Sequence, residues 1–214
     1  MKPMGGGATV EDDPVGAVLL RETAPEADRN RWRVRAYNSS TTQVSTLHPR
    51  VICSTDTTLA YVSGLDAPLR PGESNRSSTA LCGSQFVVGG GFQAGDSTFV
   101  GQTDLAGIRA WSARANYRNF DPNAPLSFVR ALAVCSDVQP AVNSSDTVNL
   151  AAGAVGTAHV ECPQGKVPTG GGGTGGLDVL LNTSNMTETG WTVQAINTAP
   201  GPRTLVATVL CTAP

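Results

Sequence analysis

The chain repeats one pattern of Gly, Trp, Ala and Cys three times, and this repeat constrains the fold more than any other feature. Each unit has a Gly-Gly-Gly triplet, then a Trp, then an Ala four residues later, and finally a closing Cys. The triplets end at Gly7, Gly91 and Gly173, the Trp residues are Trp32, Trp111 and Trp191, and the closing cysteines are Cys53, Cys135 and Cys211. The Trp positions lie 79 and 80 residues apart, which indicates one supersecondary unit used three times.

Period-two alternation predicts strands in every unit. The segments that begin at the Trp, residues 32–36, 111–115 and 191–195, place Trp and Ala on one face and polar side chains on the other. Further strands are expected at 18–23, 98–103 and 179–183 and at the closing segments 129–135 and 205–211. No window has helical periodicity.

The repeat therefore predicts one all-β domain over residues 1–214, built from three pseudo-symmetric antiparallel units. The units are residues 1–53, 82–135 and 162–211, and the connectors are residues 54–81 and 136–161. Connectors of this length are long for plain loops, so we expect β structure inside them, for example at 148–150.

The Gly triplets call for a structural reason, because Gly permits a close approach of neighbouring backbone. They predict a crowded point near a symmetry axis or a bulge that bends a strand. Residues 171–176 also match the motif G-x-G-x-x-G, which occurs in dinucleotide-binding proteins. No helix or βαβ context follows, so we interpret these glycines as structural rather than as a dinucleotide site.

Five cysteines lie at repeat-equivalent places and lack the spacing of zinc ligands. We expect disulfides Cys82–Cys135 and Cys162–Cys211, each joining the opening of a unit to its closing strand. The rival pairing, Cys53–Cys82 and Cys135–Cys162, would bracket the connectors. Disulfides imply an oxidising compartment, so a secreted location is expected.

Cys53 has no partner in the first pairing. The cysteine equivalent to Cys82 and Cys162 would fall just before Met1, so we expect the sequence to be a mature or trimmed form. The alternative is that the first unit has diverged and lost this cysteine. The natural partner of Cys53 would then lie in a removed segment or in a neighbouring chain.

Composition excludes several function classes. Lys and Arg number 15 against 17 Asp and Glu, without a basic stripe or tail, so nucleic-acid binding is not expected. No apolar stretch approaches the ~18 residues of a membrane span. Charged residues are scarce at 15%.

The pattern Cys162-Pro163-x-Gly165, Gly171-Gly172-Gly173, Trp191-x-Val193-x-Ala195-x-Asn197 and Val209-x-Cys211 resembles a repeat of secreted bacterial proteins, especially of actinobacteria. The threefold all-β layout is also similar to the β-prism group, which includes vitelline-membrane outer-layer protein and jacalin-like lectins. That resemblance implies a β-prism-like fold. The lectin sugar site does not match residue by residue, so the ligand-binding residues stay unassigned.

Candidate chemistry is sparse. His48 and His159 lie in unrelated parts of the repeat, and Gly95-Asp96-Ser97 is similar to a block of one esterase family without that family's α/β context. Glu11-Asp12-Asp13 could hold Ca²⁺ but fits a solvated turn better. No catalytic residue, metal or cofactor is therefore assigned. The three Trp are interpreted as equivalent, mostly buried core residues, and sugar stacking is the alternative.

Two functions remain open. The first is a non-catalytic, extracellular structural or partner-binding protein of a larger assembly or oligomer. The second is a lectin-like carbohydrate-binding module, and a hydrolase is a remote third. A complementary surface or an open edge strand would favour the first. Exposed Trp and equivalent polar pockets would favour the second.

Overall fold

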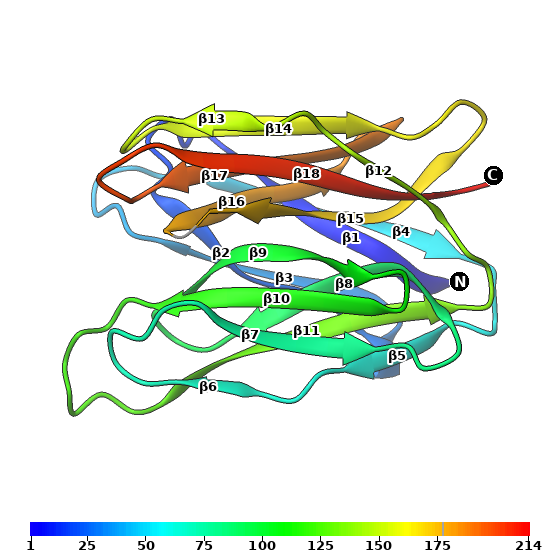
Figure 1. Ribbon diagram of the computed structural model, residues 1–214, viewed down its shortest axis with the longest axis horizontal. Helices are drawn as coiled ribbons and strands as arrows, with labels where there is room; N and C mark the ends of the chain where they lie inside the picture. Colours follow the sequence, from blue (N-terminus) through cyan, green and yellow to red (C-terminus); the bar gives the residue numbers. More distant parts are fainter. Residues whose placement is uncertain (177) are drawn as a thin grey trace.

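The computed structural model describes residues 1–176 and 178–214, and most of these residues lie in β-strands. Within the described residues there are eighteen strands, one short 3-10 turn and no α-helix. The all-β prediction is confirmed. Figure 1 looks onto one of the sheets, and both termini lie at the same end of the molecule.

The three units contain the same four main strands in the same order. Unit 1 has β1 (Lys2–Glu11), β2 (Val18–Glu26), the turn η1 (Ala27–Arg29), β3 (Arg31–Asn38) and β4 (Thr46–Ser54). Unit 2 has β8 (Phe86–Ala94), β9 (Thr98–Gly107), β10 (Ala110–Tyr117) and β11 (Ser127–Ser136). Unit 3 has β15 (Val167–Gly175), β16 (Val179–Met186), β17 (Gly190–Asn197) and β18 (Arg203–Thr212).

Each connector contains β structure, as its length predicted, and this structure consists of three short strands. The first contains β5 (Ala60–Ser63), β6 (Ala67–Leu69) and β7 (Arg76–Leu81). The second contains β12 (Ala141–Ser144), β13 (Val148–Leu150) and β14 (Val155–Glu161). The expected strand at 148–150 is therefore present.

The strands form three antiparallel sheets. Sheet A has the order β14-β17-β16-β1-β4, sheet B has β3-β2-β8-β11-β5 with β6 also on β11, and sheet C has β12-β18-β15-β9-β10-β7 with β13 also on β18. Sheet C faces the viewer in Figure 1.

Every unit divides its strands between two sheets. The Gly-rich strand and the closing strand enter one sheet, and the Trp strand and its hairpin partner enter the next. Each sheet therefore joins two units, and sheet A joins unit 3 back to unit 1 through the pairing of β16 with β1. This cyclic arrangement gives the pseudo-threefold fold that the repeat predicted, and the arrangement is β-prism-like, as the resemblance implied.

Each Trp lies over one glycine of its own unit. A Cβ atom on Gly6, Gly90 or Gly171 would overlap the indole of Trp32, Trp111 or Trp191 respectively. The three indole N–H groups donate to equivalent hydroxyls, on Thr23 at 2.8 Å, Thr103 at 3.0 Å and Ser184 at 3.0 Å. Glycine is thus required because an aromatic ring occupies the space of a side chain.

The first glycines of the triplets meet neighbouring backbone. A Cβ atom on Gly5 would overlap the Thr169 carbonyl, and one on Gly89 would overlap the Met4 carbonyl. On Gly170 it would overlap the backbone of Gly89. Each unit therefore contacts the next at these glycines, and a register shift lies beside each of them. Both predicted reasons for the triplets, crowding and a bulge, are present.

The predicted alignment of the third triplet is one residue out. Gly170, Gly171 and Gly172 are equivalent to Gly5–Gly7 and Gly89–Gly91, so Gly173 does not match Gly7 and Gly91. The error arises because residues 170–173 are four consecutive glycines, which sequence alone aligns in two ways. The Trp contact decides the register.

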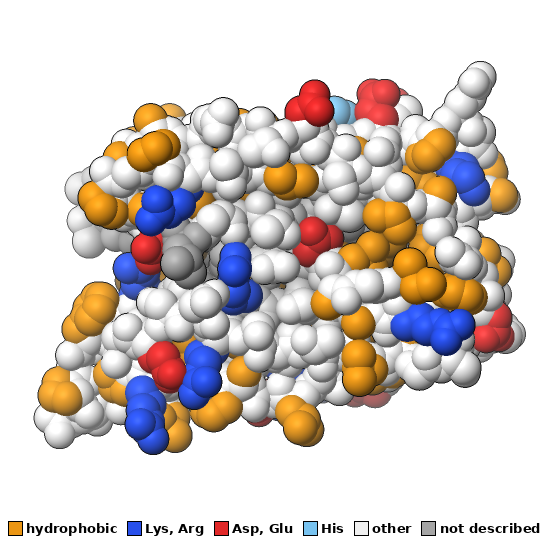
Figure 2. Space-filling model, viewed as in Figure 1, with side chains coloured by type: hydrophobic (Ala, Val, Ile, Leu, Met, Phe, Trp, Pro, Cys, Tyr) orange, Lys and Arg blue, Asp and Glu red, His pale blue; other side chains and the backbone are white. Residues whose placement is uncertain are grey.

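The core is continuous across the units. The largest buried side chains include Trp111, Trp191 and Phe92. Figure 2 shows hydrophobic side chains gathered toward the right-hand end of this face, while acidic and basic side chains lie close together toward the left. Among the described residues, no helix is long and apolar enough to cross a membrane.

Candidate functional site

In units 2 and 3 the connector covers both outer strands of the unit. Strand β7 pairs with the Trp strand β10, and β14 pairs with the Trp strand β17. Strands β5 and β6 pair with the closing strand β11, and β12 and β13 pair with the closing strand β18. Each of these two units is therefore closed by the chain segment that precedes it.

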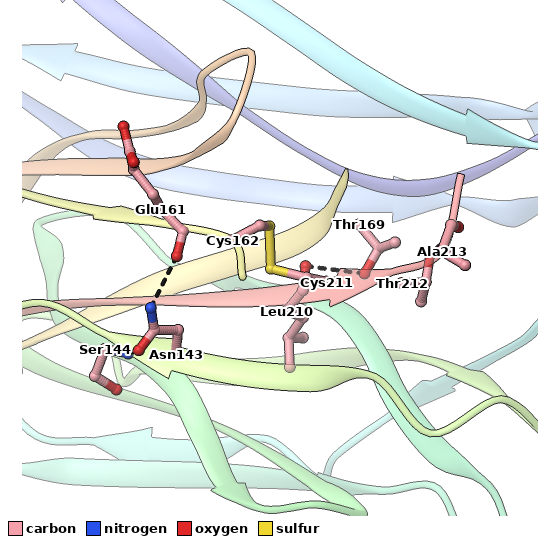
Figure 3. Close-up of a disulfide and its surroundings, with 9 residues drawn as sticks. All are labelled: Asn143, Ser144, Glu161, Cys162, Thr169, Leu210, Cys211, Thr212 and Ala213. Carbon is pink, nitrogen blue, oxygen red and sulfur yellow. Dashed lines mark hydrogen bonds between the residues drawn. A yellow bond between two sulfur atoms is a disulfide. The ribbon is translucent and has the colours of Figure 1, made fainter. Parts of the chain in front are cut away.

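A disulfide joins each covering segment to its unit. The two bonds are Cys82–Cys135 and Cys162–Cys211, with Cα–Cα distances of 5.6 and 5.9 Å, and they are the pairs that the sequence predicted. Figure 3 shows the second bond and, beside it, Asn143 on β12 donating to the Glu161 carbonyl on β14 at 2.9 Å. The two parts of the connector are thus tied to each other as well as to the unit.

Unit 1 lacks such a cover among the described residues. Its Trp strand β3 ends sheet B and its closing strand β4 ends sheet A, so both have an unpaired outer edge. Val51 on β4 is 44% exposed, whereas the equivalent Ala133 and Val209 are both 0% exposed. We call the surface between β3 and β4 the unit 1 groove.

The prediction that the three Trp residues are equivalent and mostly buried is wrong for Trp32. Trp111 and Trp191 are 0% and 1% exposed, but Trp32 is only partly buried. Its indole keeps the glycine contact and the hydrogen bond to Thr23. The difference arises because β7 and β14 pass beside the other two Trp strands, and no described strand does so at β3.

A cavity opens at one end of the unit 1 groove. It has a volume of about 180 Å³ and is lined by Val10, Val18, Ala36, Asn38, Ser45, Thr46 and Leu47. In units 2 and 3, the covering strands place Leu69 opposite Ser127 and Leu150 opposite Arg203. Ser127 and Arg203 each lie eight residues before the closing cysteine of their unit, and Ser45 holds this position in unit 1. Leu69 and Leu150 are buried, at 0% and 2% exposed.

Cys53 lies on β4 toward the opposite end of the unit 1 groove from the cavity. Its thiol is free and the residue is exposed, whereas the equivalent Cys135 and Cys211 are bonded and buried. Nearby, the Tyr61 hydroxyl donates to the Pro3 carbonyl at 2.9 Å. Burial raises the pKa of Tyr61, and the charge of a Cys53 thiolate raises it further.

The outward side of β3 carries a ladder of Arg and Glu residues. Arg33 pairs with Glu22 at 2.6 Å and with Glu26 at 3.0 Å, and Arg31 also pairs with Glu26. The hydrogen bond from Arg31 holds the pKa of Glu26 below its usual value. Glu22 is buried and also accepts from Gln93 at 2.8 Å. With Arg35, the ladder has three Arg against two Glu and so one excess positive charge.

A second hollow lies where the three units meet at one end of the prism. Its floor is formed by the repeat-equivalent side chains of Leu19, Phe99 and Leu180, which pack together. The hollow has a volume of about 620 Å³, and its wall includes Arg21, Tyr37, Ser39, Asp96, Ser97, Arg118 and Thr198. We call it the axial pocket.

Charged side chains of the axial pocket are paired. Arg21 bonds to Asp96 and lowers the pKa of that carboxyl, and Arg118 bonds to Asp178 at 2.6 Å. The Tyr37 and Phe99 rings lie 5.9 Å apart. The pocket therefore combines an aromatic wall with polar groups.

The other residues singled out in the sequence lie apart from one another. His48 lies 3.1 Å from Glu11 on neighbouring strands, and His159 contacts Thr192 at 2.9 Å. Asp13 accepts the N–H groups of Ala17 and Val18 at 2.7 and 2.8 Å, so it caps a turn.

Asp96 and Ser97 lie in the axial pocket, and neither histidine is among the described residues that line it. The structure therefore does not bring a Ser-His-Asp group together at this position. No cluster of metal-ligating side chains occurs in the part of the chain that the structure describes.

The axial pocket was missed by sequence reasoning. The signal was present, because Leu19, Phe99 and Leu180 hold the same place in the three aligned strands. Nothing in one strand shows that the three side chains converge.

Comparison with known proteins gives no identity: no protein family matches this chain, and no curated protein matches it.

Proposed function

We propose that this protein is a non-catalytic, extracellular binding protein of a larger assembly, and that the unit 1 groove binds a protein partner. The observation that carries the proposal is the contrast between one open unit and two covered units of the same fold. Unpaired strand edges next to exposed apolar side chains are templates for strand addition. The two disulfides support an oxidising, extracellular location.

Selection from a displayed library of random peptides tests this function. Recovered peptides are measured on the wild-type protein and on the variants Val51→Lys and Val142→Lys. Both valines are 44% exposed and lie on the outermost strand of a sheet, so the second variant is a matched control. Groove binders should lose affinity for Val51→Lys and keep it for Val142→Lys. Peptides that bind all three proteins alike, or an empty selection, would reject the proposal.

A lectin-like function is the second candidate, and the axial pocket supports it. Tyr37 is 46% exposed and offers an aromatic face beside Arg21, Asp96 and Arg118. Sugars are bound in proteins by such combinations of stacking and hydrogen bonding. Binding to a glycan array should then be lost in Tyr37→Ala and kept in Val51→Lys. If glycans bind the Tyr37→Ala variant as well as they bind the Val51→Lys variant, the axial pocket is not a glycan site.

A further inference from the structure

We propose that the partner in the unit 1 groove is a separate polypeptide that adds two short strands and one cysteine, and that this cysteine forms a disulfide with Cys53. The inference rests on the proposed function and names the chemistry of the partner. Units 2 and 3 show what such a partner would look like. The equivalent surface of each is covered by a segment of short strands that is joined to the unit by a disulfide.

One partner strand would pair with β3 and resemble β7 and β14. In the sister units Ala80 stands opposite Trp111 and Val160 opposite Trp191, so a small or branched apolar residue faces the indole. The cysteine follows two residues later, at Cys82 and Cys162. The backbone N–H groups of these cysteines donate to the carbonyls of Arg109 and Thr189. Asn30 holds the equivalent position in unit 1.

The other partner strand would pair with β4 and end in a leucine that fills the cavity. Leu69 and Leu150 have this role in the register of the covered units. The cavity of about 180 Å³ is no smaller than the ~150 Å³ cavities that hold a benzene-sized group, and Val10, Val18 and Leu47 are among its apolar lining. The cavity and the free thiol lie toward opposite ends of one groove, so a single segment reaches both.

Charge adds a preference for an acidic residue in the partner. In unit 3 the strand β14 places Glu161 opposite Gly190, and the unit 1 position equivalent to Gly190 is Arg31. Paired residues of an antiparallel ladder share a face, so this glutamate would add to the Arg-Glu ladder, which has one excess Arg. The segment 141–162 of this chain therefore fits the groove better than the segment 60–82, which has Leu81 at that position.

The covalent step is thiol–disulfide exchange. The Cys53 thiolate attacks the partner cysteine, which is already oxidised as a disulfide with a low-molecular-weight thiol. A new S–S bond forms to Cys53, the old one breaks, and the small thiol leaves as a thiolate. The mixed disulfide between the partner cysteine and the small thiol is thus the oxidant.

The test uses the whole protein with Cys53 reduced and a peptide of residues 141–162 whose cysteine carries glutathione. Intact mass follows the mixed disulfide. The peptide should react more than about tenfold faster than a scrambled peptide of the same composition, a ratio that corresponds to about 1.4 kcal/mol of non-covalent binding. Replacing Leu150→Ser in the peptide should remove most of this advantage. The protein variant Cys53→Ser should give no product.

A second measurement tests non-covalent binding of the peptide, with no disulfide to Cys53. The same peptide with Ser in place of its cysteine should shift Trp emission to shorter wavelength on Cys53→Ser protein, because Trp32 becomes covered. Val51→Lys should abolish the shift and Val142→Lys should not. Equal rates for native and scrambled peptides would overturn the inference, and so would a Cys53–Cys53 dimer that forms in preference to the mixed disulfide.

The two proposals can fail separately. If library peptides depend on Val51 but lack the leucine and cysteine pattern, and the 141–162 peptide reacts no faster than its scrambled form, the binding function stands and this inference falls. If no peptide depends on Val51, both fall.

Discussion

Trp111 and Trp32 occupy equivalent positions in the repeat but differ in how much of each side chain the fold covers. Trp111 is fully buried beside β7, while Trp32 is only partly buried at the open edge of sheet B. Both donate an indole hydrogen bond to a threonine hydroxyl. The environment, rather than the residue, therefore determines the energetic contribution of each Trp.

Replacing Trp111→Ala should lower the free energy of unfolding by about 3–5 kcal/mol, as large core deletions do. Trp32→Ala should cost about 1–2 kcal/mol, because less of its surface leaves water on folding. Urea unfolding of the two variants measures this difference. Equal losses of unfolding free energy in the two variants would mean that Trp32 is as well packed as Trp111.

Asp104 is a partly buried carboxylate whose shifted pKa predicts a pH effect. It accepts from the Leu105 N–H at 2.7 Å and from the hydroxyls of Thr174 and Thr208 at 2.9 and 3.1 Å. Burial raises its pKa in spite of these hydrogen bonds. The folded protein therefore holds this proton at a pH at which the unfolded chain has released it.

From the raised pKa of Asp104 it follows that stability falls as pH rises from the unfolded-state pKa, about 3.9, to the folded-state pKa of this carboxyl. Asp104→Asn removes this titration. The variant should gain stability relative to wild type at about pH 7, and the gain should shrink at about pH 3, where both states of the wild type are protonated. Thermal melting at the two pH values measures the effect. A difference that is the same at both would show that Asp104 does not titrate in this way.

At the scale of the strand, the contact of glycine with Trp makes the Gly-rich strands intolerant of side chains. Gly90 lies in the middle of β8, and the space of its missing Cβ is occupied by the Trp111 ring. The same arrangement recurs on β1 and β15. These strands pack closely against an aromatic residue of a neighbouring sheet.

Gly90→Ala should therefore destabilise the fold by about 1–3 kcal/mol or more, because Trp111 must leave its position. Gly201→Ala is the control, since the atom nearest to its Cβ would be 4.0 Å away on a flexible Arg side chain. It should change stability by less than about 0.5 kcal/mol. Circular dichroism melting of both variants gives the comparison, and similar shifts would contradict the predicted clash.

For the whole molecule, the three units differ in closure although they share one fold. Units 2 and 3 are each covered by a connector and closed by a disulfide over a loop of 53 or 49 residues. A cross-link over a loop of this size stabilises by about 4 kcal/mol in the chain-entropy model. Unit 1 has neither feature among the described residues.

Native-state hydrogen exchange should therefore be uneven around the pseudo-threefold axis. Amides of β3 and β4 should exchange faster than those of β10 and β11 or β17 and β18, because local opening of unit 1 exposes less buried surface and breaks no covalent link. Exchange measured by mass spectrometry on the disulfide-intact protein tests this. Uniform protection across the three units would show that the open edge does not weaken unit 1.

The sequence alone determined the architecture, because Gly, Trp and Cys act through local and repeated constraints. Alternation predicted the strands, equal spacing predicted the pseudo-threefold domain, and cysteine placement predicted the bonds of Cys82 and Cys162. The alignment of the triplets was wrong at Gly173, because four consecutive glycines can be matched to a triplet in two ways, and the contact of Gly171 with Trp191 shows which match is correct.

The candidate sites were decided by tertiary structure, since they depend on which strands become neighbours. The exposure of Trp32, the cavity beside Ser45 and the convergence of Leu19 with its two equivalents arise between segments that are distant in the chain. A repeat makes three units alike in sequence. Whether a unit is covered depends on a strand contributed from outside it, and that is a property of the assembled sheets.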